Sequence, residues 1–286
     1  MLKGAVIRGD KCVLEFGDLY FEVANTPAGR VTSARIGQSE ILTGPSVDAA
    51  NYGSTFWTSP QADWAWPPLP EMDTVAFTAT SDDTSCTLTG PKISASAHPN
   101  VDGLSLTKKF TADFAKQAVS IQYTIKNQGT ASKRVAPWEI TRVAGGGLTF
   151  FANDSAPTAG TMALLPTTSG AGCLWFKHTT SVMESKLFAD GKGWIAHVTP
   201  QNLILIKSFP NIMQSQAASG EAEIEVYASP IAKNYVEVEN QGAISDIPAG
   251  GMLNWTVRWY VRTLPSTVMA TPGNQALVDF VTQTIQ

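Results

Sequence analysis

The sequence is short of charge of either sign. Only 15% of its 286 residues are Asp, Glu, Lys or Arg, and the formal net charge is -4. Lysines and arginines are scattered, and they are adjacent only at Lys108-Lys109 and Lys133-Arg134. A nucleic-acid surface or an acidic solvating tail is therefore not indicated. The composition favours a small neutral or anionic metabolite as the partner.

Cysteine is scarce as well. Cys12, Cys86 and Cys173 lie far apart and form no Cys-x-x-Cys pair. The sequence therefore predicts neither a disulfide framework nor a zinc site. We expect all three cysteines to be buried small apolar residues, and we expect no metal or cofactor.

Long hydrophobic runs are also missing. No segment approaches the ~18 uninterrupted apolar residues of a membrane span. Arg8 and Asp10 break the apolar run at the N-terminus, so that run is not the core of a signal peptide. Neither a membrane nor a nucleic acid is an expected partner. The expected setting is reducing and cytoplasmic, provided that no leader has been removed.

What the chain does have is a succession of short strands. Hydrophobic residues make up 43% of the sequence, and turn signals such as Gly9-Asp10 and Gly17-Asp18 separate short alternating segments. No long segment with helical periodicity interrupts them. This pattern predicts an all-β protein, a large antiparallel sandwich that spans residues 1–286 as one domain. A helical apolar stripe over residues 274–285 predicts a short C-terminal helix that docks on the sandwich.

One strand is expected to carry the chemistry. In Tyr235-Val-Glu-Val-Glu-Asn-Gln241 the side chains alternate, so Tyr235, Glu237, Glu239 and Gln241 share one face. Two valines occupy the opposite, apolar face. A ring, two acids and an amide in a row would suit a polyhydroxylated ligand.

A segment rich in tryptophan and proline lies earlier in the chain. Residues 51–70 contain three of the eight tryptophans and four prolines, and this composition predicts an ordered irregular loop rather than a central strand. Trp57, Trp64 and Trp66 would either offer flat faces for a sugar to stack on or plug the end of the sandwich.

A second polar and aromatic cluster covers residues 135–142. Pro137 predicts an edge strand or a bulge there. Glu139 and Arg142, next to Trp138, would form either a wall of the site or an ion pair at the rim of a sheet. Among the three histidines, His178 follows a strand and is a candidate proton donor, although a histidine beside or within a strand is more often structural.

The clearest strand covers residues 252–262, with an apolar face and a polar face. Only a short turn separates it from the strand that carries the acids, so the two are expected to pair as antiparallel neighbours. Arg258 would then lie beside Glu237 or Glu239 and keep that carboxylate ionised.

Three short motifs resemble the galactose mutarotase-like superfamily. Ala28-Gly-Arg-Val31 is similar to its opening Gly-Gly-x-Ile element, and Pro137-Trp-Glu139 stands where the aldose epimerases carry His-Pro-Tyr-Phe. Val238-Glu-Asn-Gln241 is similar to the Leu-Glu-x-Gln segment that supplies their catalytic base. The resemblance implies a β-supersandwich with a carbohydrate site on a concave sheet. The sequence departs from the family pattern in one respect, since no histidine stands where the epimerases keep their general acid.

The resemblance implies a mutarotase-like reaction, in which a base takes the proton of the anomeric hydroxyl and an acid protonates the ring oxygen. Glu239 would be the base. Glu139 or His178 would be the acid, and Glu237 would bind a hydroxyl or tune Glu239. The remaining candidates are ligand-binding residues: Gln241, Arg258, the tryptophans Trp57, Trp64, Trp66 and Trp138, and Arg30 or Arg142 for an acidic or phosphorylated sugar.

Two other functions stay open. A noncatalytic carbohydrate-recognition protein would bind sugar through its tryptophans without turnover. A lyase or hydrolase on the same fold would cleave an oligosaccharide, and a hydrolase would need two carboxyl groups at the separation found in glycosidases.

Overall fold

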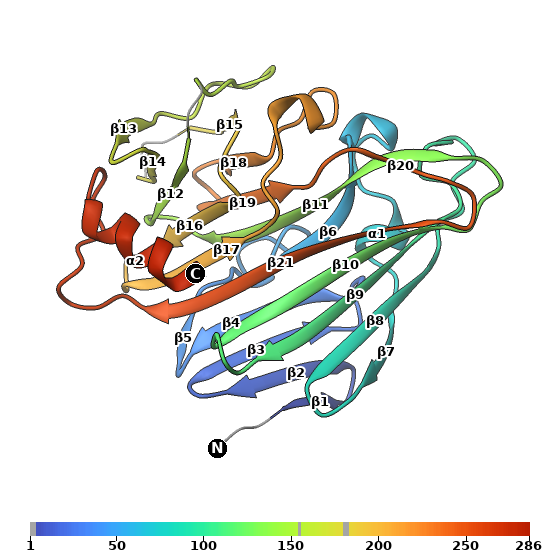
Figure 1. Cartoon of the computed structure of the whole chain (residues 1–286), viewed down its shortest axis with the longest axis horizontal. Helices are drawn as coiled ribbons and strands as arrows, with labels where there is room; N and C mark the ends of the chain where they lie inside the picture. The colour runs from blue at the N-terminus through green and yellow to red at the C-terminus, as the bar shows by residue number, and fades with distance from the viewer. Residues whose placement is uncertain (1–3, 154–155, 180–182) are drawn as a thin grey trace.

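The computed structural model describes residues 4–153, 156–179 and 183–286, which form two antiparallel β-sheets (Figure 1). The eleven-stranded sheet has the order β1 (Ala5–Arg8), β2 (Lys11–Phe16), β3 (Leu19–Ala24), β4 (Arg30–Ile36), β6 (Ser54–Ser59), β11 (Lys133–Ala144), β19 (Tyr235–Gln241), β18 (Ile224–Ala228) and β15 (Ser185–Ala189). Two short strands, β5 (Ser39–Glu40) and β20 (Ser245–Ile247), pair with β4 and β11. The predicted all-β class is confirmed.

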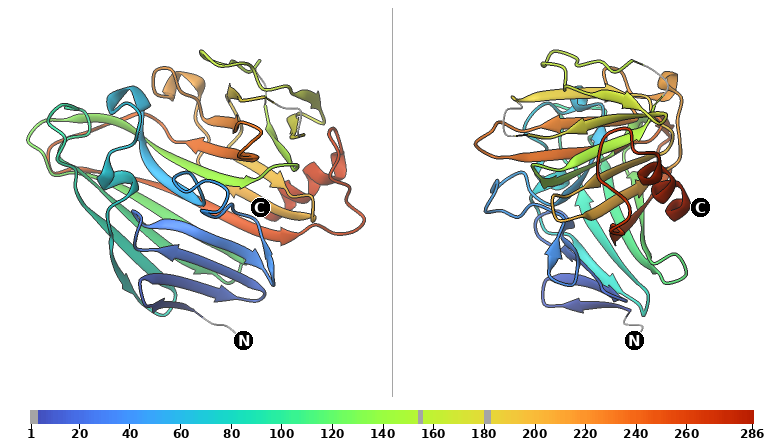
Figure 2. Two further views of the ribbon diagram at one scale, coloured as in Figure 1. Left: turned by 180° about the vertical axis from the view of Figure 1, so that it is seen from behind. Right: turned by 90° about the vertical axis from the view of Figure 1, so that its left-hand side faces the viewer.

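The ten-stranded sheet covers one face of the first sheet (Figure 2). Its order is β13 (Thr168–Gly170), β14 (Cys173–Lys177), β12 (Leu148–Ala152), β16 (Trp194–Val198), β17 (Leu203–Ser208), β21 (Met252–Thr263), β10 (Ala118–Asn127), β9 (Leu104–Asp113), β8 (Ser85–Lys92) and β7 (Thr78–Ser81). Aromatic rings from the two sheets interlock between them. The Phe56 and Tyr123 rings are stacked at 4.0 Å, and Phe21 meets Trp259 edge-on at 5.6 Å.

Helices are few and short in the described residues. They are α1 (Pro70–Asp73), α2 (Gln275–Ile285) and two 3-10 turns, η1 (Gln61–Asp63) and η2 (Gln214–Gln216). In α2 the Asn274 side chain caps the first turn by accepting a hydrogen bond from the Ala276 backbone at 3.0 Å. Leu277 and Val281 are buried in a second apolar cluster with Tyr260 of β21. The predicted C-terminal helix is confirmed, and it packs on the outer face of the ten-stranded sheet. No helix in the described ranges is long and apolar enough to cross a membrane.

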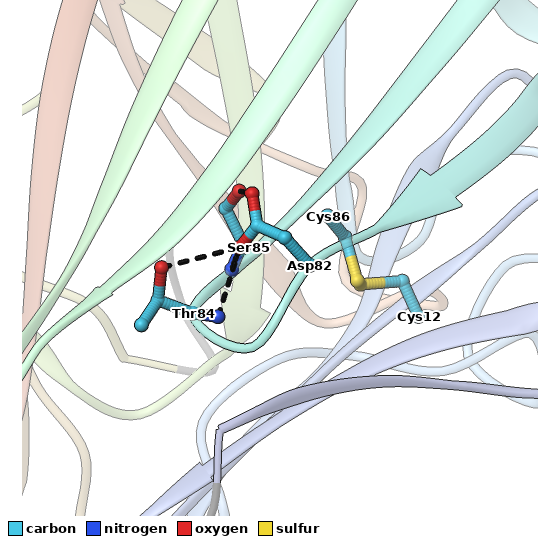
Figure 3. Close-up of a disulfide and its surroundings, with 5 residues drawn as sticks. All are labelled: Cys12, Asp82, Thr84, Ser85 and Cys86. Atoms are coloured by element: carbon cyan, nitrogen blue, oxygen red, sulfur yellow. Dashed lines mark hydrogen bonds between the residues drawn. A yellow bond between two sulfur atoms is a disulfide. The ribbon is translucent and has the colours of Figure 1, made fainter.

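The cysteines differ from the prediction. Cys12 in β2 and Cys86 in β8 form a disulfide between the two sheets, beside a turn in which Asp82 accepts hydrogen bonds from Thr84 and Ser85 (Figure 3). Cys173 alone is a free, buried thiol. The sequence showed no pairing because the two cysteines are separated by 74 residues and meet only when the sheets stack. Since disulfides persist mainly in oxidising compartments, the cysteines no longer support a reducing setting.

The prediction of a loop over residues 51–70 is wrong for Ser54–Ser59, which form β6. β6 is a central strand that pairs with β11 along its whole length and with β4 at Ser54. The four prolines all follow this strand, beginning at Pro60. Ser-Thr-Phe-Trp-Thr-Ser is therefore free of proline and rich in β-formers, which suits a strand that is buried on both faces.

The prediction of an edge strand or a bulge at Pro137 is also wrong. β11 is a continuous central strand and not an edge, with β6 on one side and β19 and β20 on the other. Pro137 is tolerated because β20 pairs with residues 133–135 and β19 with residues 138–144. The proline therefore falls in the short gap between these two ladders.

The expected pairing between the acid-bearing strand and residues 252–262 does not occur. β19 lies between β11 and β18 in one sheet, while β21 lies between β10 and β17 in the other. The segment between β19 and β21 crosses from one sheet to the other, so these two strands are close in sequence but do not pair. Arg258 is exposed and lies opposite Ser120 and Ser208, and it therefore cannot contact Glu237 or Glu239.

Candidate functional site

The candidate site lies on the face of the eleven-stranded sheet that points away from the ten-stranded sheet. The direction follows from β11, where Glu139 and Thr141 contact Lys207 of the ten-stranded sheet. Because side chains alternate along a strand, Trp138 and Arg142 project from the opposite face. The pairing of β11 with β19 sets Arg142 opposite Glu237 and Trp138 opposite Gln241.

A pocket of about 410 Å³ opens on this face. Its floor comes from β19, β11, β18 and β15, and its rim comes from the segments around η1 and before β19. The lining residues are Asn51, Trp57, Gln61, Trp66, Trp138, Ile140, Arg142, Met162, Glu184, Lys186, Tyr227, Pro230, Lys233, Tyr235, Glu237 and Glu239. Tyr235, Glu237 and Glu239 thus share the pocket face, as the alternation of the strand predicted.

Glu237 is the more accessible of the two acids on β19, with 15% of its side chain exposed. Its Oε1 accepts a hydrogen bond from Arg142 Nε at 2.8 Å, and Arg142 also donates to Thr55 Oγ1 at 2.9 Å. Burial raises the pKa of the Glu237 carboxyl, Arg142 opposes this effect and Glu239 adds to it, and the net direction is upward. Glu237 is therefore suited to hold a proton at a higher pH than an exposed glutamate.

Glu239 forms the deeper part of the floor, and only 1% of its side chain is exposed. Its Oε2 accepts a hydrogen bond from Trp138 Nε1 at 3.0 Å, and its Oε1 lies 3.4 Å from Lys186 Nζ. Trp138 is next to Glu139 in sequence, but its indole N–H contacts Glu239. The Lys186 side chain beside this carboxylate is 14% exposed.

Lys186 and Glu225 extend the cluster, and sequence analysis missed both. Lys186 Nζ lies 2.6 Å from Glu225 Oε2, and Gln241 Nε2 donates to Glu225 Oε1 at 2.6 Å. Burial raises the pKa of Glu225 well above its usual value, although Lys186 opposes this. Burial lowers the pKa of Lys186, but Glu225 and Glu239 outweigh it and raise the pKa overall. Lys186 thus binds two carboxylates at once and stays charged.

Three of the four candidate tryptophans line the pocket, and the fourth packs behind them. Trp57 and Trp138 lie in adjacent strands at paired positions, and their rings meet edge-on at 5.6 Å. Trp66 packs edge-on against Trp57 at 6.1 Å and lies at the rim. Trp64 is not in the lining, because it is buried behind Trp57 and donates its indole N–H to the Thr58 carbonyl at 2.8 Å.

Glu139, one of the two candidate acids, is on the opposite face of the sheet from the pocket. It is fully buried between the sheets, where it accepts hydrogen bonds from Tyr123 and from Trp259 Nε1 and forms an ion pair with Lys207 at 2.8 Å. The error has a simple cause. Glu139 lies between Trp138 and Ile140, the strand partner of Glu239, and neighbours in a strand point in opposite directions.

The other candidates outside the pocket have structural contacts of their own. His178 accepts a hydrogen bond at Nδ1 from the Gly146 backbone at 2.8 Å, and burial lowers its pKa. Arg30 is buried in an ion pair with Asp73 at 2.9 Å. Gln241 is buried beneath the floor, where it contacts Glu225. These three residues do not line the pocket.

Within the described ranges, no group of three or more His, Cys, Asp or Glu side chains is arranged to hold a metal ion. The carboxylates in and next to the pocket floor contact protein cations, since Glu237 pairs with Arg142 and both Glu225 and Glu239 pair with Lys186. The chemistry open to this arrangement is proton transfer and hydrogen bonding to hydroxyl groups.

Several of the solved structures that match this architecture are described as galactose mutarotase-like. Galactose mutarotase-like proteins from Lactobacillus casei and Clostridium acetobutylicum both align with a TM-score of 0.61 at 10% sequence identity. The first alignment covers 88% of this chain and 100% of that chain, and the second covers 91% and 98%. A galactose mutarotase related enzyme from Lactobacillus acidophilus aligns with a TM-score of 0.59 at 7% identity, over 89% of this chain and 98% of that one.

The chain has the galactose mutarotase-like fold. The relationship is visible in structure alone, because no protein-family model matches the sequence and no curated protein matches it. At 7–10% sequence identity, a shared fold does not show that this chain shares an activity with these proteins.

Within the galactose mutarotase-like fold, one sequence signal could have found Lys186. Lys186 and Phe188 alternate with Leu187 and Ala189 in a short strand, so a charged side chain on one face was visible. Its position opposite Tyr227, in the strand next to Glu237, depends on strand order, which no local pattern contains.

Proposed function

We propose that this protein binds carbohydrate in the pocket over β19 and acts on the anomeric centre as a mutarotase-like isomerase. One observation carries the proposal: Glu237 and Glu239 lie on the floor of the same pocket as the indoles of Trp57, Trp66 and Trp138. Carboxylates accept hydrogen bonds from sugar hydroxyls, and indole faces suit the C–H faces of a pyranose. The galactose mutarotase-like fold of the solved neighbours supports the same class of ligand.

The geometry suggests a division of roles. Glu239 takes the proton from the anomeric hydroxyl while Glu237, whose pKa is raised, donates a proton to the ring oxygen. The bond between the anomeric carbon and the ring oxygen breaks to give the open-chain aldehyde, and the reverse proton transfers close the ring on either face. Residues two apart on a strand lie roughly 7 Å apart, so the two carboxyl groups can approach neighbouring oxygens from different sides. Glu237 thus takes the role that the sequence assigned to Glu139 or His178, and Lys186 takes the role assigned to Arg258.

Anomer exchange tests the proposal directly. Neutral aldoses, uronic acids and sugar phosphates would be followed by proton exchange spectroscopy with wild type, Glu239→Gln and Glu237→Gln. We expect wild type to accelerate exchange of at least one sugar. Each variant should lower the rate by about 10²–10⁴-fold, the usual contribution of a general acid or base. Affinity for that sugar should change much less in Glu239→Gln, because the amide keeps the shape of the carboxylate.

Asp246→Asn is the matched control, since Asp246 is an exposed acid outside the pocket lining, and its exchange rate should equal that of wild type. If every sugar interconverts at the uncatalysed rate in the presence of wild type, the isomerase proposal is wrong.

A noncatalytic sugar-recognition protein is the second candidate, and one observation favours it. Glu239 is nearly inaccessible beneath Lys186 and Trp138, as suits a carboxylate that shapes a pocket rather than one that exchanges protons. Under this alternative, calorimetry detects sugar binding that falls in Trp57→Ala, while exchange stays at the uncatalysed rate for every sugar that binds.

A further inference from the structure

Trp66 is exposed where every other tryptophan is buried. Its relative exposure is 57%, whereas the other seven tryptophans are at most 6% exposed. Burying an indole is strongly favourable, so an open ring at the rim of a pocket needs an explanation. It lies on the segment after η1, held edge-on against Trp57, and its face remains free to contact a ligand.

The pocket is also longer than its acidic part. The lining follows β19 from Tyr235 to Glu239, which is about 13 Å at the usual rise of a strand. Trp138 and Trp57 extend it by one further row, opposite Gln241, and Trp66 packs against Trp57 of that row. A single pyranose placed over Glu237 and Glu239 therefore leaves the tryptophan end uncovered.

The charges of the lining indicate a neutral ligand. Arg142, Lys186 and Lys233 face Glu184, Glu237 and Glu239, so basic and acidic side chains are equal in number. Arg142 and Lys186 are already paired with the carboxylates of the floor, and Lys233 pairs with Asp48 at 2.5 Å. Arg30 is outside the lining. The arginines that sequence analysis offered to an acidic or phosphorylated sugar are thus occupied.

We propose that the ligand is an uncharged reducing oligosaccharide of at least two units. The reducing unit lies over Glu237 and Glu239, and the next unit stacks its C–H face on Trp66. The proposal rests on the proposed sugar site and adds its substrate class. It makes Trp66 the residue that distinguishes an oligosaccharide from a free monosaccharide, because a lone reducing unit does not reach the ring.

Calorimetric titration of matched sugar series tests this. The probes are glucose with maltose, maltotriose, cellobiose and cellotriose, and galactose with β-1,4-galactobiose, because each series keeps its reducing unit constant. In at least one series we expect the disaccharide to bind wild type about tenfold more tightly than its monosaccharide, an effect typical of a tryptophan contact. Trp66→Ala should remove this advantage and leave the monosaccharide affinity unchanged.

Two further variants keep the test sharp. Trp66→Phe should retain most of the advantage, because it keeps an aromatic face. Met269→Ala, which removes another exposed apolar side chain outside the pocket lining, should behave as wild type. Thermal unfolding confirms that each variant is folded.

The outcomes separate the two proposals. If monosaccharides and oligosaccharides bind equally and Trp66→Ala changes nothing, the oligosaccharide inference is overturned while the sugar site stands. If no sugar in any series binds, both proposals are wrong.

Discussion

His197 in β16 is a fully buried imidazole, and burial lowers its pKa to about 3, with smaller contributions from His178 and Lys177. Its Nδ1 is 2.9 Å from Thr149 Oγ1, while Nε2 has no hydrogen-bond partner among the described residues. The folded protein therefore keeps this ring neutral at pH values where the unfolded chain would protonate it.

This difference predicts acid sensitivity. As the pH falls below about 6.5, the unfolded chain takes up a proton that the native state refuses, so the free energy of unfolding decreases by up to about 1.4 kcal/mol per pH unit from this group. His197→Asn keeps a polar atom near Thr149 but does not titrate. Urea unfolding at pH 7, 6, 5 and 4 should show a flatter pH dependence for the variant than for wild type.

His98→Asn is the control for this measurement, because His98 is a partly exposed turn residue, and its pH dependence should follow that of wild type. Parallel curves for wild type and His197→Asn would contradict the assignment.

At the scale of the elements, the central strands of the two sheets are joined by a buried ion pair. Lys207 of β17 contacts Glu139 of β11 at 2.8 Å, and it also donates to Thr141 Oγ1 and the Val238 carbonyl. Burial lowers the pKa of Lys207, and Glu139 opposes this. Breaking such a pair leaves a charge in the core without compensation, which costs more than the loss of an exposed pair.

Lys207→Met is therefore expected to lower the free energy of unfolding by about 3–5 kcal/mol. Adding Glu139→Gln should restore part of this loss, because the amide is uncharged, its oxygen can accept from the Trp259 indole N–H, and its NH2 group can donate to the Tyr123 hydroxyl. Chemical denaturation measures both variants, with Asp246→Ala in the exposed Arg134–Asp246 pair as the control, where the change should stay below about 1 kcal/mol. A double variant no more stable than Lys207→Met would show that charge burial is not the cause.

At the scale of the whole molecule, the Cys12–Cys86 disulfide ties the two sheets together near the N-terminal edge of the sandwich (Figures 1 and 3). The two strands that it joins are 74 residues apart in sequence, so the bond closes a long loop in the unfolded chain. Loop closure restricts the unfolded ensemble more than the folded one.

Removing the bond should therefore lower the stability by about 4.5 kcal/mol on the loop-entropy estimate. The Cys12→Ala/Cys86→Ala protein and the chemically reduced wild type should both unfold at lower urea concentration than the oxidised wild type. Cys173→Ala, measured without reductant, should not show this shift, since Cys173 is a free thiol and the variant keeps the disulfide. Three titratable thiols in the denatured, unreduced protein would argue against the bond.

Much of the architecture was predictable because it is local. Strand periodicity indicated an all-β protein, the apolar stripe indicated α2, and alternation set Glu237 and Glu239 on one face. The prediction for residues 51–70 failed because it treated the composition of the whole segment as uniform. The prolines begin only after β6 ends, so the first part of the segment could form a strand.

The sequence by itself determined which side chains share a face of each strand, since the two-residue period is a property of the backbone. Only the tertiary structure decided which strands became neighbours. It paired β19 with β11 and β18 rather than with β21, brought Arg142 and Lys186 to the two acids, and turned Glu139 into the core. The reason is physical: strand order follows from burying both sheets against one another, and that energy belongs to contacts between segments far apart in the chain.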